Sequence, residues 1–251
     1  MVKGGIKANQ MTAPTQPTTL RARFEAFVKT LEGFEDIDTL LKNQDVAGKK
    51  RADYLFQNRS IIVEQKSLEI DPADKPQKFI EQLINEGKLM FWGTRSTEAI
   101  FRKMPNGDEL RKQLSLKIGK IVSDNVEYAD KQVRDTREIF NIPRASCILV
   151  ILNEDASTLF PGIVTYALKN SFQKRRDGEY RYRNIDGVLL ISEAHPVETP
   201  GFQKSFLIQP YMAPATENGA AVSAYMEMMA NRWAQFNGAA FISSSAGAPK
   251  L

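Results

Sequence analysis

The chain has 251 residues, of which 42% are hydrophobic and 25% charged, and its formal net charge is +4. This composition is that of an ordinary folded protein and excludes collagen-like, strongly disordered and disulfide-rich classes. The single cysteine, Cys147, excludes a disulfide within one chain, and the single histidine, His195, excludes a histidine pair. No apolar stretch approaches the roughly 20 residues that cross a bilayer, so we expect a cytoplasmic protein that makes no membrane contact.

Hydrophobic spacing predicts helices and strands in a mixed order along the first half of the chain. Residues 1–18 lack periodicity and are expected to form a flexible arm. The elements expected next are a helix capped by Thr18 or Thr19 and stopped by Gly33, a short helix at 37–41, strands at 51–56 and 60–68, and a helix at 75–86. The two strands are separated by three polar residues, which predicts a hairpin.

The second half continues this alternation. The expected elements are a helical stretch at 108–140 with a candidate break at 123–125, a buried strand at 145–152, a helix at 159–172, strands at 186–192 and 202–209, and a helix at 220–236. Residues 243–251 are expected to form a flexible tail. Because no long linker divides 19–242, we predict one α/β domain, with a mixed central sheet flanked by helices and with added helices.

The predicted hairpin brings unlike charges together. A two-residue loop at Asn58 and Arg59 places Asp53 directly opposite Glu64, and strand alternation puts Lys66 on the same face as Glu64. Opposed carboxylates repel each other, and a divalent cation would relieve the repulsion. A metal held by these carboxylates could polarise a phosphodiester and activate water, with Lys66 orienting the water or stabilising the charge that builds on phosphorus.

The residues around this pair also carry a family resemblance. The segments KRADYLF at 50–56 and IIVEQK at 61–66 resemble the core of PD-(D/E)XK nucleases, which include restriction endonucleases and Holliday-junction resolvases. The chain departs from that pattern by having Ala52 where the motif has proline. The resemblance implies a restriction-endonuclease-like core, with Mg²⁺ held by Asp53 and Glu64. Mn²⁺ is an expected substitute for Mg²⁺.

The resemblance implies two further side chains at the site. One is an acidic residue from the first helix, for which Glu25, Glu32 and Glu35 are candidates, with Glu25 the first choice as a metal ligand. The other is a polar residue on the helix after the hairpin, for which Gln82 is the first candidate and Lys78 the second. Each of these residues could equally be an exposed helical side chain.

Two basic clusters are candidates for contacting nucleic-acid phosphates. One is beside the site and the other surrounds Asp177 and Gly178, where basic and aromatic residues alternate in a hairpin or loop. The candidate binding residues are Lys49, Lys50, Arg51, Lys174, Arg175, Arg176, Arg181 and Arg183. Either cluster could instead be a solvated surface segment.

The sequence therefore predicts a Mg²⁺-dependent nuclease that acts on nucleic acid, with DNA favoured over RNA, and that could form a homodimer. A nucleic-acid-binding module that does not cut is the alternative, and a subunit of a larger assembly is a third. The chain contains no phosphate-binding Gly-rich loop, no GxSxG turn and no HExxH helix, so nothing supports nucleotide-driven, serine-hydrolase or zinc-protease chemistry.

Overall fold

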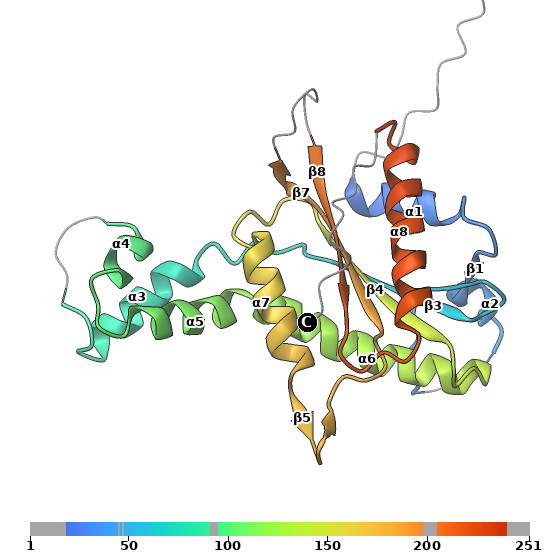
Figure 1. The fold of residues 1–251 in the computed structure, drawn as a ribbon, viewed down its shortest axis with the longest axis horizontal. Helices are drawn as coiled ribbons and strands as arrows, with labels where there is room; N and C mark the ends of the chain where they lie inside the picture. The colour runs from blue at the N-terminus through green and yellow to red at the C-terminus, as the bar shows by residue number, and fades with distance from the viewer. Residues whose placement is uncertain (1–18, 45, 47, 91–94, 198–204, 240–251) are drawn as a thin grey trace, which may run out of the picture.

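The computed structural model describes residues 19–44, 46, 48–90, 95–197 and 205–239, and its main body is a mixed six-stranded sheet (Figure 1). The strands, in spatial order, are β1 (Glu35–Asp36), β2 (Tyr54–Phe56), β3 (Ile61–Ser67), β4 (Ser146–Asn153), β7 (Gly187–Val197) and β8 (Ser205–Met212). β3, β4 and β7 run parallel, whereas β1, β2 and β8 join by antiparallel pairing. The expected α/β class is confirmed, and the expected flexible ends lie outside the described residues.

Helices cover both faces of the sheet. They are α1 (Leu20–Val28), α2 (Ile37–Leu40), α3 (Lys75–Asn85), α4 (Thr97–Phe101), α5 (Gly107–Ile118), α6 (Lys120–Phe140), α7 (Pro161–Phe172) and α8 (Gly219–Phe236). The apolar sides of α6 and α7 pack on one face, and those of α1 and α8 pack on the other. Among the helices in the described ranges, none combines the length and apolar character needed to cross a membrane.

Strand alternation explains why both faces need a cover. In β4, Cys147 and Leu149 belong to the core under α6 and α7, whereas Ile148 and Val150 belong to the core under α1 and α8. All eight residues of β4 are buried, as expected for a central strand of a sheet covered on both sides. The Cys147 thiol is fully buried in this strand.

The hairpin of β2 and β3 has the predicted register. Leu55 pairs with Ile62, and Gln57, Asn58 and Arg59 all adopt the left-handed backbone conformation, with φ of 49°, 52° and 66°. A two-residue turn with positive φ at both positions matches the twist of antiparallel strands and therefore fixes how they align. The observed strands are shorter than predicted, because the chain bends at Asp53 before β2 begins.

The long helical stretch breaks at a different position from the one expected. The candidate break at 123–125 is wrong, because α5 ends at Ile118 and α6 starts at Lys120, around Gly119. A Cβ on Gly119 would lie 2.7 Å from the Cβ of Ala167 on α7, so only glycine allows this close approach. Close packing against α7 therefore requires glycine at the position where the two helices meet.

The other strand predictions need smaller corrections. The last strand begins at Ser205 and continues to Met212, and residues 202–204 of its prediction lie outside the described residues. β7 extends beyond its prediction to Val197. Around Asp177 and Gly178 the structure shows a hairpin of two short strands, β5 (Arg175–Arg176) and β6 (Glu179–Tyr180).

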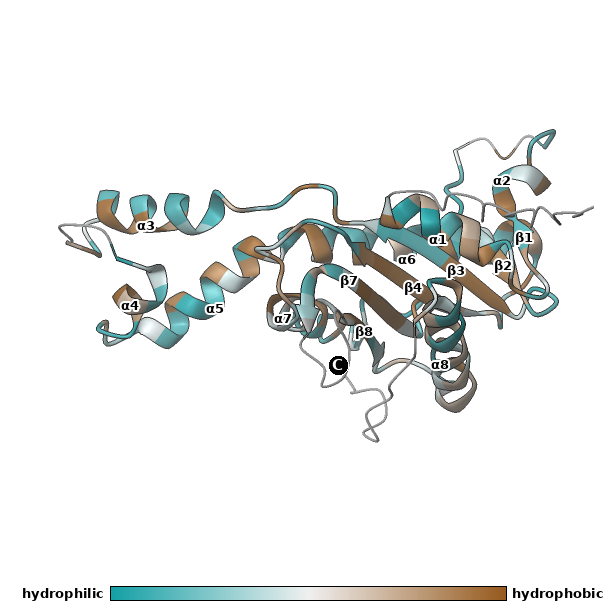
Figure 2. Ribbon diagram, turned by 90° about the horizontal axis from the view of Figure 1, so that it is seen from above, coloured by the Kyte–Doolittle hydropathy of each residue, from teal (hydrophilic) through white to brown (hydrophobic). Residues whose placement is uncertain are grey.

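Helices α3, α4 and α5 form an arm that projects beyond the sheet (Figure 2). Phe79 of α3 contacts Phe101 of α4 edge to face, with ring centroids 6.1 Å apart. The buried residues of the arm are continuous with the core beneath α6 and α7. The arm therefore shares the core of the main domain, and α6 follows it directly along the chain.

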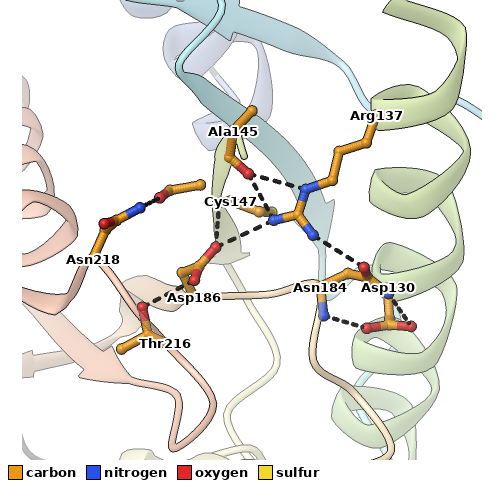
Figure 3. A network of polar contacts seen from close by, with 9 residues as sticks. Asp130, Arg137, Ala145, Cys147, Asn184, Asp186, Thr216 and Asn218 are labelled. Atoms are coloured by element: carbon orange, nitrogen blue, oxygen red, sulfur yellow. Dashed lines mark hydrogen bonds and ion pairs between the residues drawn. The ribbon is translucent and has the colours of Figure 1, made fainter. Parts of the chain in front are cut away.

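A network of polar contacts joins the C-terminal half of α6 to the sheet (Figure 3). The Arg137 guanidinium donates hydrogen bonds to the carbonyl oxygen of Ala145 and to Asn184, and it pairs with Asp186 at 3.4 Å. Asp186 also accepts hydrogen bonds from the Cys147 N–H and the Thr216 hydroxyl. These bonds hold α6 in place against β4 and β7. They therefore also hold in place the other α6 side chains that face the sheet.

Candidate active site

The hairpin brings the three predicted site residues together. Glu64 and Lys66 lie on the face of β3 that α6 covers, and the hairpin register continued by one residue sets Asp53 across from Glu64. Asp53 lies in the bend before β2, where its Oδ2 accepts a hydrogen bond from the Gln65 N–H at 2.7 Å. The Lys66 ammonium forms an ion pair with Glu64. Two carboxyl groups and one ammonium therefore share one small region.

The Glu64 carboxyl group is buried, and the Lys66 ammonium is its charged partner. Its side chain has 0% of its surface exposed, and Lys66 contacts one of its two oxygens, Oε1. Burial, followed by the negative charge of Asp53, raises the pKa of Glu64 to about 8, although Lys66 opposes the shift. Burial also raises the pKa of Asp53. Because one ammonium does not neutralise two buried carboxylates, a further cation here would stabilise their ionised forms.

Helix α6 positions the lysine and the chain that leads to Asp53. The Gln132 Oε1 accepts a hydrogen bond from the Lys66 Nζ at 2.8 Å, while its Nε2 donates to the Arg51 carbonyl oxygen at 2.7 Å. One turn later, the Thr136 hydroxyl accepts a hydrogen bond from the Ala52 N–H at 2.8 Å. The site is therefore held from two sides, by the hairpin and by α6.

Gln132 is a site residue that the sequence reasoning missed. The residue expected in this place, Gln82, is exposed on α3, where its side chain bonds to Glu86 and Lys117, so the structure does not bring it to the site. One sequence signal could have pointed to α6, because Gln132 and Thr136 lie one turn apart beside the apolar stripe of a long amphipathic helix. That signal would not have identified the partners of Gln132.

The acidic candidates from the start of the chain lie elsewhere. Glu25 belongs to α1, which packs on the opposite face of the sheet from Glu64, and its side chain pairs with Arg21 at 2.9 Å. Glu35 pairs with Arg59 at 2.7 Å, and Glu32 is exposed. The structure therefore brings none of the three to the site.

The residues in place fit a magnesium ion that is completed by water and substrate. Across the described ranges, the structure shows no group of three or more His, Cys, Asp or Glu side chains arranged to hold a metal. Asp53 and Glu64 offer two carboxylates, and Mg²⁺ is commonly held by one or two carboxylates together with waters and substrate phosphate oxygens. The observation that favours this fit is that two neighbouring carboxyl groups share one ammonium, so that their ionised forms carry an excess negative charge.

Comparisons with known proteins do not assign a function to this chain. Protein-family models, curated proteins and solved structures were all compared with the chain, and none matches it. The chemistry must therefore be inferred from the side chains and their surroundings.

The basic residues predicted to contact nucleic acid occupy two places. Lys49, Lys50 and Arg51 line a cavity of about 500 Å³ that also reaches Lys66. The second cluster surrounds the hairpin of β5 and β6, and its exposed residues are Lys174, Arg175, Arg176, Arg181 and Arg183. Within this second cluster, the Arg175 guanidinium lies 4.1 Å from the centroid of the Tyr180 ring. Both clusters are connected to α6, the first through Lys50 and the second through Arg181, which pairs with Glu127 at 3.4 Å.

Proposed function

We propose that the chain is a metal-dependent nuclease in which Asp53 and Glu64 hold Mg²⁺ and Lys66 assists the attacking water. The observation that carries the proposal is that the fully buried Glu64 carboxyl group lies across from Asp53, so that two acidic groups are close together while one ammonium, that of Lys66, pairs with Glu64. A purely structural hairpin has little reason to bury two repelling acids together, because apolar residues of similar size would cost less. A bound cation would offset the negative charges of the two carboxylates.

The proposed roles follow from the positions of the side chains. When bound, Mg²⁺ would polarise a phosphodiester and lower the pKa of a bound water. The Lys66 ammonium, held by Gln132, is placed to orient that water or to stabilise negative charge on the phosphorus oxygens. The α6 contacts to the Arg51 and Ala52 backbone hold the chain that leads to Asp53.

The same proposal includes a restriction-endonuclease-like core of the PD-(D/E)XK type. Its support is the Asp53 and Glu-Gln-Lys pattern on adjoining antiparallel segments, together with the parallel pairing of β3 with β4. The mildly basic chain and its two basic clusters favour nucleic acid as substrate, with DNA ahead of RNA.

A nucleic-acid-binding module that does not cut is the second candidate. The exposed hairpin of β5 and β6 favours it, because Arg175 over Tyr180 is a surface suited to phosphate and base contacts whether or not the chain cleaves. The cleavage experiment below separates the two functions.

The test is a cleavage panel of single-stranded, double-stranded and branched DNA and of RNA, each with Mg²⁺, Mn²⁺ or EDTA. We expect cleavage with either metal, none with EDTA, and none by Asp53→Asn or Lys66→Ala. A matched control is the exposed pair Glu86 and Lys88, which has the same Glu-x-Lys spacing and an ion pair of 2.7 Å on the arm. Glu86→Gln and Lys88→Ala should cut at the wild-type rate. Wild-type cleavage by either site variant would remove the proposal, and binding without cleavage would favour the second candidate.

A further inference from the structure

The cavity beside Lys66 is lined by donors and cations. It has a volume of about 500 Å³ and lies between α6 and the chain that leads to Asp53. Its lining residues are Lys49, Lys50, Arg51, Lys66, Asn125, Tyr128 and Gln132. None of these seven residues is acidic, and four are cationic. The cavity is wide open to solvent, so it suits part of an extended ligand that passes over the surface, and its lining favours an anion.

Two of these donors lack an oxygen acceptor: the Lys50 ammonium contacts only the Tyr128 ring among the described residues, and the Asn125 Nδ2 donates no hydrogen bond. The Lys50 ammonium makes no ion pair within the described part of the chain, whereas Lys49 pairs with Glu138 and Arg51 pairs with Asp38. The Asn125 Nδ2 is shielded from solvent but donates no hydrogen bond. A phosphate group has the acceptor oxygens that both donors lack, and a charge-assisted bond to Lys50 would be the stronger of the two contacts.

An aromatic ring lies beside these donors. Tyr128 has 51% of its surface exposed, and two lysines lie over its ring, with the Lys50 Nζ 5.1 Å and the Lys131 Nζ 5.8 Å from the centroid, so a stacked base would displace one of these flexible side chains. A half-exposed aromatic ring next to an unpaired cation provides a surface for a base and a contact for its phosphate. Because the bases of a duplex are already stacked on each other, only an unpaired nucleotide could present its face to Tyr128.

We propose that this cavity receives an unpaired nucleotide of the nucleic-acid strand, with its base on Tyr128 and its phosphate at Lys50 and Asn125. The inference rests on the proposed nuclease function, because Lys66 belongs both to the cavity and to the site where the strand would be cut. It adds a substrate class, namely a strand that is single-stranded at this point.

The chain offers a continuation for such a strand along α6. Glu127, the neighbour of Tyr128, pairs with Lys131 on the same helix and with Arg181 after the hairpin of β5 and β6. Tyr182 also donates a hydrogen bond to Glu127. The basic hairpin is thus fastened to α6 one residue from Tyr128, so nucleotides beyond the cavity would meet its exposed arginines.

The test is a binding measurement in EDTA, where no cleavage is needed. The probe is a fluorescent single-stranded oligothymidylate of roughly 12 nucleotides, a length within the range that such sites cover. Competitors are a duplex of the same length and thymidine monophosphate. Tyr128→Ala should weaken binding of the single strand roughly tenfold, and Tyr128→Phe should leave it unchanged. Lys50→Ala should weaken binding and lower the salt dependence by about one phosphate contact.

Two substitutions serve as matched controls. Phe160→Ala removes a ring that is 50% exposed and does not line the cavity, and Lys112→Ala removes an exposed lysine on α5. Both should bind the probe as the wild type does. Binding by Tyr128→Ala within twofold of the wild type would overturn the inference, as would equal competition by the duplex or by thymidine monophosphate.

The results of the two experiments distinguish the cavity inference from the nuclease proposal. If Tyr128→Ala weakens binding but no substrate is cut with Mg²⁺, the cavity stands and the nuclease proposal fails. If Mg²⁺ supports cleavage that depends on Asp53 while Tyr128→Ala binds normally, the nuclease stands and the cavity inference fails.

Discussion

Replacing Glu64 with glutamine should stabilise the metal-free protein, and the gain should grow with pH. The Glu64 side chain is fully buried, and the Asp53 charge lies across from it. An ionised carboxylate in these surroundings is unfavourable, whereas a neutral amide of nearly the same shape removes the charge. Glu64→Gln therefore tests directly whether this position is suited to a cation.

The magnitude follows from the raised pKa. The pKa of Glu64 is about 8 in the folded protein, against an ordinary value of 4.5. Between these two pH values the folded state holds a proton that the unfolded state has lost, so the free energy of unfolding falls as pH rises. At about 1.4 kcal/mol for each pH unit, the loss approaches 5 kcal/mol above pH 8, which is an upper bound because water entry and local relaxation would reduce it. Below pH 4.5 the loss disappears.

The assay is urea unfolding of the wild type and Glu64→Gln in EDTA, at several pH values from about 5 to 9. We expect similar stabilities at the acidic end and a more stable variant at the basic end. Adding Mg²⁺ should raise the unfolding free energy of the wild type most at high pH, because the metal binds the deprotonated pair. The same addition should have little effect on Glu64→Gln. The exposed residue Glu32 gives a control, since Glu32→Gln should follow the wild-type profile.

Parallel pH profiles for the wild type and Glu64→Gln would refute this reasoning. They would mean that the Glu64 carboxyl group is compensated in the folded protein without metal. Wild-type stability that is insensitive to Mg²⁺ at every pH would contradict the metal assignment separately.

Two further predictions concern α6. Gln132→Leu should lower cleavage roughly tenfold, because it removes the hydrogen bond that holds the Lys66 ammonium. Its free energy of unfolding should change by less than about 1 kcal/mol. Wild-type activity of this variant in the cleavage panel would contradict the positioning role of Gln132. Arg137→Ala should lower the free energy of unfolding by roughly 3 kcal/mol, because it leaves Asp186 buried without its cation. Urea titration measures this loss against Arg134→Ala, which removes an exposed arginine and should change stability by less than about 1 kcal/mol. Equal losses in the two arginine variants would contradict the importance of the buried network.

The hairpin shows what local sequence can predict. Its register depends on a two-residue turn and on strand alternation, both of which are set by residues close together in the chain. The pairing of Leu55 with Ile62, and with it the position of Asp53 across from Glu64, therefore followed from the sequence. The helices and buried strands were also recognisable, because their hydrophobic periods are local properties.

The helix break and the partner of Lys66 show where local reasoning fails. Gly119 lies at the junction of α5 and α6, where α7, far along the chain, leaves no room for a Cβ. Gln132 reaches Lys66 because α6 crosses this face of the sheet, whereas Gln82, which is closer in sequence, lies on the arm. Glu25 belongs to a helix of suitable composition but on the opposite face.

The sequence by itself determined the α/β class, the hairpin register and the grouping of Asp53, Glu64 and Lys66, because these depend on the period of side chains along neighbouring segments. Only the tertiary structure decided that Glu64 is fully buried, that α6 supplies Gln132, and that Lys50 and Tyr128 share a cavity with Lys66. Burial and contacts between distant residues depend on how helices pack across the sheet, and no local pattern in the chain specifies that packing.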